Sequence, residues 1–179
     1  MKTLKRILIV IAILIALPLL IALFIKKDYS VERQITINKP SYEVFDYVKS
    51  LRNQDSFSKW GNMDPDMKQT YTGKDGTVGF ISAWESEDKN VGKGEQEIVS
   101  IDEGKRIEYK LRFIEPFEST SYAYMTTDEI SKNETLVKWG FDGRMNYPMN
   151  LMLLFMNFEE MIGDDLQHGL ENLKAILEE

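Results

Sequence analysis

The sequence predicts an α+β fold, with an antiparallel sheet of about seven strands, one long C-terminal helix and one N-terminal transmembrane helix. Three observations lead to this class. The chain of 179 residues has an uncharged run of 19 residues near its start, Ile7–Ile25. Beyond it, most segments alternate with the period of strands and are joined mainly by short turns. After Pro148 the apolar residues return to helical spacing and keep it to the end.

The N-terminal run is long enough to cross a bilayer. About 20 apolar residues span the hydrocarbon core as a helix, whereas a cleaved signal peptide has an apolar region of about 7–15 residues and then a small-residue cleavage site. Here Lys26 and Lys27 follow the run at once, without such a site. We therefore expect residues 1–27 to be an uncleaved anchor that spans with residues 7–25, and residues 28–179 to form one domain. A signal peptide is the alternative.

Charges on the two sides of this run nearly balance, because three Lys or Arg residues precede it and four lie within residues 26–39. Positive charge marks the cytoplasmic side of a span. The shortness of the N-terminal tail favours a cytoplasmic N-terminus. We expect a single-pass protein, in a bacterial cell membrane, with its domain on the extracytoplasmic side.

Composition excludes several classes of function. Residues 1–27 carry five cations and no acid, so the rest of the chain has 17 Lys and Arg and 29 Asp and Glu, which gives it a formal charge of −12. Such an acidic domain repels phosphate backbones, so nucleic acid is not an expected partner. The chain has no cysteine, which excludes disulfides and zinc–thiolate sites, and His168 is its only histidine. We expect no metal, no cofactor and no catalytic triad.

The domain begins with a strand and a helix. In residues 29–37 the side chains of Val31, Arg33, Ile35 and Ile37 share one face, which predicts a strand. Pro40 then marks a helix start, since its missing N–H costs nothing there. The apolar stripe of this helix consists of Val44, Phe45, Val48 and Leu51. Residues 52–67 are expected to be a polar connection with one more short helical turn.

About six strands follow, separated by the turn signals "KDG", "EDKN", "DEGK", "EPF" and "SKN". Residues 106–114 alternate most regularly, with Ile107, Tyr109, Leu111 and Phe113 on one face and charged residues on the other. In residues 118–130 the pattern leaves the inward face open: it is either the one with Tyr122 and Tyr124 or the one with Ala123 and Met125.

The last segment predicts one amphipathic helix from about residue 149 to the C-terminus. Its first turns contain "MNLMLLFM", in which Met149, Met152 and Met156 fall on one face. The continuous apolar run there is six residues long, Leu151–Met156, far too short to span a membrane. A helix with such a stripe has to bury it against the sheet.

In this order, six segments resemble the START-like helix-grip (SRPBCC) superfamily, which includes the birch pollen allergen and bacterial polyketide cyclase/dehydrase-like proteins. The resemblance covers about residues 30–179. It rests on "ITINKPSYEVFDYV", "FSKW", "TVGFISAW", "VGKGEQEI", "ETLVKWGFDG" and "LQHGLENLKAILEE". It implies a curved sheet that grips the C-terminal helix and leaves an apolar cavity for a lipid, sterol, polyketide or other hydrophobic molecule. Some members of the superfamily are enzymes, and others only carry or sense a ligand.

Eight side chains are candidates for lining such a cavity. Tyr and Trp combine an apolar face with one polar group, and Met adapts to varied ligands. Packing in an ordinary core is the alternative for every one of them. The candidates are Trp84, Tyr109, Phe113, Trp139, Phe141, Met149, Met152 and Met156.

Three functions remain open. The first is a membrane-tethered, non-catalytic binding protein for a hydrophobic small molecule or lipid. The second is a cyclase or dehydrase, which would need a buried acid or base with a shifted pKa in the cavity. The third is a protein-interaction module, which a large exposed apolar patch would favour.

Overall fold

The computed structural model describes residues 2–179. Its sheet has seven antiparallel strands in the order β1-β7-β6-β5-β4-β3-β2, so the predicted α+β class and strand number are confirmed. The elements are α1 (Lys2–Ala22), β1 (Asp28–Ile37), α2 (Ser41–Val48), α3 (Leu51–Phe57), the 3-10 helix η1 (Trp60–Asn62), β2 (Lys68–Thr72), β3 (Ile81–Glu85), β4 (Lys93–Asp102), β5 (Arg106–Glu115), β6 (Ser119–Ser131), β7 (Glu134–Arg144), the 3-10 helix η2 (Met149–Leu154) and α4 (Phe158–Glu178).

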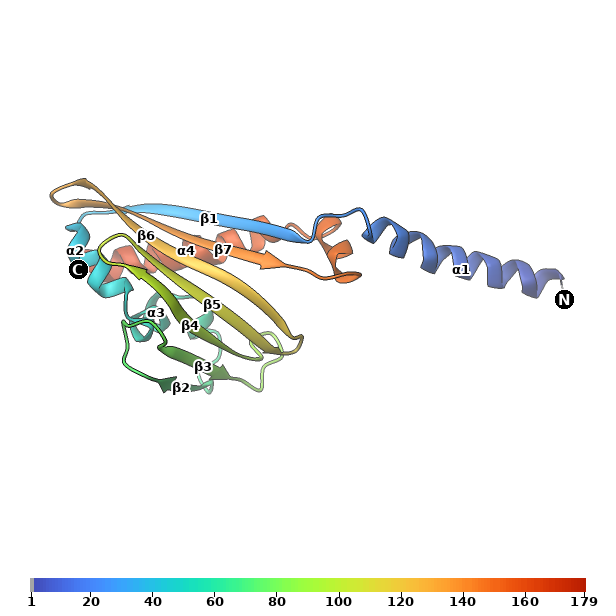
Figure 1. The fold of residues 1–179 in the computed structure, drawn as a ribbon, viewed down its shortest axis with the longest axis horizontal. Helices are drawn as coiled ribbons and strands as arrows, with labels where there is room; N and C mark the ends of the chain where they lie inside the picture. The colour runs from blue at the N-terminus through green and yellow to red at the C-terminus, as the bar shows by residue number, and fades with distance from the viewer. Residues whose placement is uncertain (1) are drawn as a thin grey trace.

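The sheet curves around α4, which runs along β1 and β7 and also contacts α3 (Figure 1). Helix α4 buries Leu166, Leu170 and Leu173 against the sheet. Glycine allows the close approach, because a Cβ atom at Gly169 would lie 2.7 Å from the ring of Trp139. This is the helix-grip arrangement that the family resemblance implied.

Inward and outward faces follow the sequence pattern. Val31, Ile37, Ile107 and Tyr109 are all buried on the concave face, as predicted. Strand β6 resolves the open alternative. Ala123 and Met125 point inward, whereas Tyr122 is exposed and the Tyr124 hydroxyl donates to Glu32 on the convex face.

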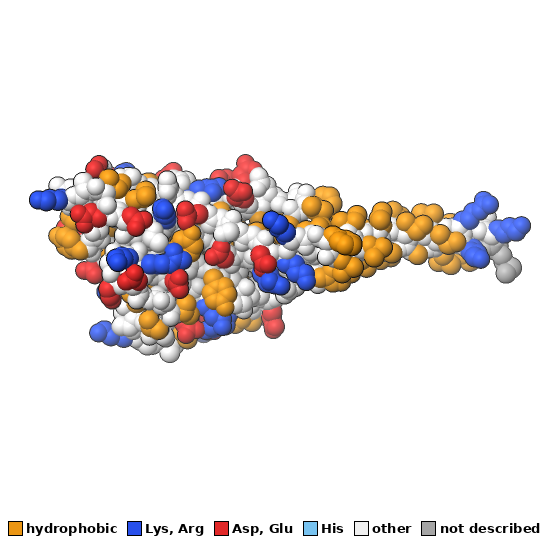
Figure 2. All heavy atoms as spheres, turned by 45° about the horizontal axis from the view of Figure 1, so that its top comes forward, with side chains coloured by type: hydrophobic (Ala, Val, Ile, Leu, Met, Phe, Trp, Pro, Cys, Tyr) orange, Lys and Arg blue, Asp and Glu red, His pale blue; other side chains and the backbone are white. Residues whose placement is uncertain are grey.

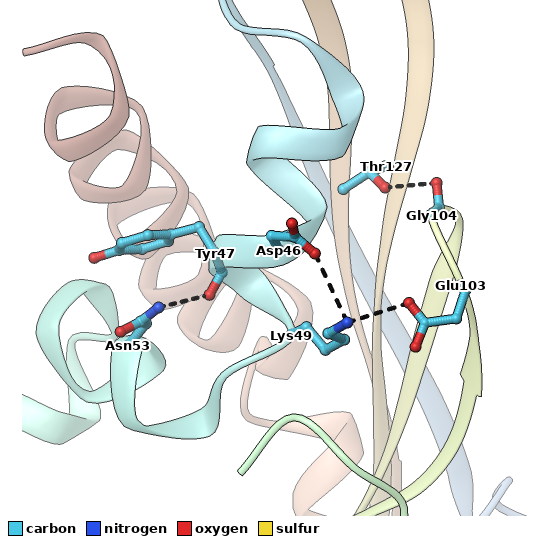
Figure 3. A network of polar contacts seen from close by, with 7 residues as sticks. All are labelled: Asp46, Tyr47, Lys49, Asn53, Glu103, Gly104 and Thr127. Carbon is cyan, nitrogen blue, oxygen red and sulfur yellow. Dashed lines mark hydrogen bonds and ion pairs between the residues drawn. The ribbon is translucent and has the colours of Figure 1, made fainter.

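Helices α2 and α3 close the end of the grip that lies far from α1. Figure 3 shows Lys49, just after α2, between Asp46 and Glu103 of the β4–β5 turn, with N–O distances of 3.7 and 3.2 Å. The region expected to be a polar connection with one helical turn contains both α3 and η1. Ser50 is the N-cap of α3, because its hydroxyl accepts the backbone N–H of Asn53 at 3.2 Å, and Asp75, remote in sequence, also accepts the N–H of Leu51 at 2.9 Å.

Residues 149–157 do not begin the long helix, and this prediction is wrong. They form η2 and a turn, and α4 starts at Phe158 with Asn157 as its N-cap. The physical reason is a contact with the N-terminal segment. The fully buried Asn150 side chain donates to the backbone carbonyls of Ala22 at 2.7 Å and Ile25 at 3.1 Å. Spacing of three residues fits a 3-10 helix as well as an α-helix.

Helix α1 projects from the domain and is long and apolar enough to cross a membrane (Figure 1). It ends at Ala22, three residues before the end of the predicted span, Ile25. Apolar side chains cover it from its basic tail to the base of the domain (Figure 2).

Candidate functional site

The concave face has two halves that differ in packing. In the half under α2, the side chains are fully buried and fill the space between sheet and helices. The Tyr109 hydroxyl donates to the Val48 carbonyl at 3.4 Å, and burial raises the pKa of this phenol. The buried set in this half comprises Val44, Phe45, Val48, Ile98, Ile107, Tyr109, Met125, Val137, Leu170 and Leu173. This half is core, with little room for a ligand.

The other half lies toward the end of the sheet where β1 begins, and its apolar side chains are only half-buried. Trp84 and Phe113 meet edge to face with ring centroids 5.9 Å apart. Both flank Gly94, which pairs with Trp84 on β3 and with Phe113 on β5. Glycine is required there, since any side chain at position 94 would collide with the Trp84 ring. Two aromatic rings therefore lie over the backbone of β4.

A row of polar groups crosses the sheet beside these rings. Strand register places Ser82 opposite Gln96, Gln96 opposite Leu111, and Leu111 opposite Ser121. The two serines are buried, and the Gln96 amide donates to Gln54 of α3 at 3.1 Å. We call this set of Ser82, Trp84, Gln96, Leu111, Phe113 and Ser121 the concave platform. It combines apolar area with a few convergent polar groups, the usual chemistry of a small-molecule site.

Two of the hollows on the described surface bear on the site. One, of about 320 Å³, adjoins the platform, because Gln69 lines it and pairs with Trp84 in the register of β2 and β3. Its other lining residues are Asp55, Gly61, Asn62, Asp64, Pro65 and Met67. The second, of about 410 Å³, lies at the start of β1 and is lined mainly by convex-face residues such as Tyr122 and Asp142. Among residues 2–179, α4 lines neither hollow.

Asp55, at the wall of the first hollow, has a shifted ionisation. Burial raises the pKa of its carboxyl, and hydrogen bonding to Tyr71 only partly offsets the rise. The Tyr71 hydroxyl lies 2.7 Å from both Asp55 Oδ2 and Gln69 Oε1. Burial and the neighbouring Asp55 together raise the pKa of Tyr71 to about 12. The single Tyr71 proton reaches one acceptor at a time, so the Asp55 carboxyl and the Gln69 carbonyl oxygen compete for it.

The structure separates the eight candidate residues into three groups. Trp84 and Phe113 lie together on the platform. Tyr109 and Trp139 are buried in the core, and Phe141 packs against Tyr29 next to it. The methionines form the third group: Met149 and Met152 lie on η2, and Met156 lies in the turn after it, beside the end of α1.

Sequence reasoning missed the polar part of the platform. Ser82 and Gln96 sit at inward positions of strands whose other inward residues are apolar or glycine, and Ser121 shares the inward face of β6 with Ala123, Met125 and Thr127. That exception to the alternation is the signal that could have found them. Asp55 gave no such signal, because its burial depends on Tyr71 and Gln69 of β2.

Comparison with known structures shows the same fold at low sequence identity. Norcoclaurine synthase from Thalictrum flavum, solved in complex with dopamine and hydroxybenzaldehyde, superposes with a TM-score of 0.60 at 8% identity, over 84% of this chain and 86% of that one. The corresponding values for Ara h 8.0201 are 0.55 and 11%, over 83% and 97%. The Aha1 dimer from Colwellia psychrerythraea gives 0.56 and 11%, over 83% and 96%.

No curated protein matches the chain in sequence. A family model, described as polyketide cyclase / dehydrase and lipid transport, matches residues 28–178. Family and fold together point to a helix-grip domain that binds a hydrophobic ligand. Since the match covers nearly all of the sequence beyond α1, the chain belongs to the polyketide cyclase / dehydrase and lipid transport family.

Proposed function

We propose that this protein is a membrane-tethered binding protein for a hydrophobic small molecule or lipid, which it holds on the concave platform. The observation that carries the proposal is the contrast between the two halves of the concave face. One half is closed by fully buried side chains, whereas the other presents Trp84 and Phe113 half-buried, with two serine hydroxyls and an amide beside them. Well-placed polar groups on apolar walls would orient an amphipathic ligand.

The tether is the second part of the proposal. Residues 1–27 act as an uncleaved anchor, and residues 28–179 form the binding domain outside the cytoplasm of a bacterial cell. Helix α1 supports this, because its 21 residues are long and apolar enough to cross a membrane, and only its C-terminal end packs on the domain, through the buried Ala22. An anchor keeps the domain close to ligands that dissolve in the membrane.

Binding is tested with the neutral fluorescent probe N-phenyl-1-naphthylamine and the full-length protein in lipid nanodiscs. We expect Trp84→Ala and Phe113→Ala each to weaken probe binding by about tenfold, since each removes one aromatic wall. Tyr122→Ala is the matched control, because it removes an exposed aromatic ring from the convex face. Equal affinities of all three variants would overturn the platform as the binding site. Signal from empty nanodiscs is subtracted.

Cyclase or dehydrase chemistry is the second candidate function, and Asp55 is the observation that favours it. A carboxyl with a raised pKa beside a hollow is the kind of group that general acid–base catalysis uses. The Asp55 carboxyl would exchange a proton with a substrate that reaches from the platform into this hollow. The binding function needs no such group.

The raised pKa of Asp55 makes stability depend on pH. The folded state keeps this proton to a higher pH than the unfolded chain, so the free energy of unfolding falls as pH rises from the ordinary aspartate pKa through the raised one. Asp55→Asn removes this titration and keeps an oxygen that accepts from Tyr71. In urea unfolding from about pH 4 to about pH 7, we expect wild type to lose stability relative to Asp55→Asn. A difference that stays constant with pH would contradict the raised pKa.

A further inference from the structure

An uncharged, exposed segment lies beside the end of α1. Residues 145–158 contain no charged side chain, although the domain as a whole is strongly acidic. Four apolar or aromatic side chains of this segment are exposed instead of packed: Tyr147 (42%), Met149 (48%), Leu154 (57%) and Phe155 (84%). A soluble surface rarely groups such side chains without a partner.

Specific contacts fix this segment to the base of α1. The Asn150 side-chain amide donates hydrogen bonds to two backbone carbonyls at the end of α1 and in the turn after it, those of Ala22 and Ile25. The Met145 backbone N–H donates to the Lys27 carbonyl at 2.8 Å. Figure 1 shows η2 next to this turn, and in Figure 2 the apolar surface of α1 continues onto the base of the domain. The exposed apolar surface of α1 and that of η2 are therefore adjacent.

From this continuity we propose that residues 147–156 form an interfacial surface that lies in the boundary between headgroups and acyl chains of the bilayer that α1 crosses. The inference rests on the proposed tether. Phe155 and Leu154 enter the acyl region, and the Tyr147 ring sits at headgroup level, where an aromatic ring with one polar group is favoured. Lys26 and Lys27, which follow α1 directly, lie at the depth of lipid phosphates and favour an anionic membrane.

The interfacial surface orients the domain on the membrane. A single helix would let the domain swing, whereas a second contact at η2 holds the end where β1 begins against the lipid. Register places the Trp84–Gly94–Phe113 row toward that same end of the sheet. The half-buried half of the concave face would then point to the bilayer, so a lipid-soluble ligand would travel only a short distance from the membrane to the platform.

The absence of native cysteine makes site-directed spin labelling direct. Three single-cysteine variants of the full-length protein, Phe155→Cys, Ile130→Cys and Leu14→Cys, carry a nitroxide in nanodiscs of phosphatidylcholine and phosphatidylglycerol. Relaxation by oxygen reports exposure to lipid, and relaxation by a water-soluble nickel chelate reports exposure to water. All three positions are exposed, so labelling leaves the core intact. Ile130 lies near the end of β6, far from α1.

We expect the Phe155 label to respond more to oxygen than to nickel, the Leu14 label to do so more strongly, and the Ile130 label to show the reverse. A Phe155 label as accessible to nickel as the Ile130 label, with the Leu14 label in lipid, overturns the interfacial surface and leaves the tether standing. A Leu14 label in water overturns the tether and the inference together. A Phe155 label shielded from both reagents overturns the inference in favour of a protein partner on this surface.

Discussion

Trp139→Ala is expected to lower the free energy of unfolding of the domain by about 3–5 kcal/mol, the usual cost of removing a large buried aromatic side chain. Trp139 is 2% exposed and joins three parts of the fold. From β7 it meets Phe57 of α3 with ring centroids 5.6 Å apart, and Trp60 of η1 at 6.2 Å. Its ring also rests on Gly169 of α4. Alanine would leave a cavity there and remove the contacts of β7 with α3, η1 and α4 that the Trp139 ring makes.

Urea unfolding followed by circular dichroism measures this change, and the matched control is Trp60→Ala. Trp60 is also a tryptophan and its ring contacts the Trp139 ring, yet it is 36% exposed and lies at the edge of the core. We expect its replacement to cost about 1–2 kcal/mol, because less apolar area leaves the core. Similar costs for the two variants would contradict the central position of Trp139. Since a domain is stabilised by about 5–15 kcal/mol, the Trp139 variant would lose a large part of its stability.

The local sequence pattern was enough to predict the strands, because the alternation of apolar and polar residues in each strand shows which of its faces is buried. The alternation from Ile107 to Phe113 is confirmed, and so is the inward face of β1. Strands β2 to β7 each pair with their neighbours in sequence, so these pairings need no information from distant parts of the chain, whereas β1 pairs with β7 at the other end of the domain. The curved grip followed from the resemblance, and the family match confirms that relationship.

Contacts between distant segments could not be predicted in this way. The spacing of Met149 and Met152 fits either kind of helix, and what decides the structure is Asn150, which bonds to carbonyls more than 120 positions earlier in the chain. The candidate site shows the same limit. The sequence pattern predicts that Trp84, Tyr109 and Trp139 are all inward aromatic residues. Only the tertiary structure shows that α2 and α4 bury Tyr109 and Trp139 and leave Trp84 half-buried.

Gly94→Ala is expected to destabilise the domain by about 1–3 kcal/mol and to weaken probe binding at the platform by about tenfold or more. Alanine is normally the better residue in a strand, so the sign of the effect is diagnostic. Here the added Cβ atom would lie 2.7 Å from the Arg112 carbonyl oxygen of β5 and would collide with the Trp84 ring. The backbone oxygen can move only with its strand, so β4 and β5 would have to separate, and Trp84 would turn away from Phe113.

Two measurements distinguish this effect from a general loss of stability. Ser100→Thr is the control, because it adds one methyl group to an exposed position of the same strand and should change neither property. Near-ultraviolet circular dichroism of Gly94→Ala should also show a changed tryptophan signal, since the edge-to-face contact of Trp84 with Phe113 is lost. If Gly94→Ala were as stable as wild type and bound the probe equally well, then Trp84 would not rest on β4, and the platform would lack the wall on which binding is proposed to depend. If it lost stability but kept full probe affinity, the ligand would have to bind elsewhere on the concave face.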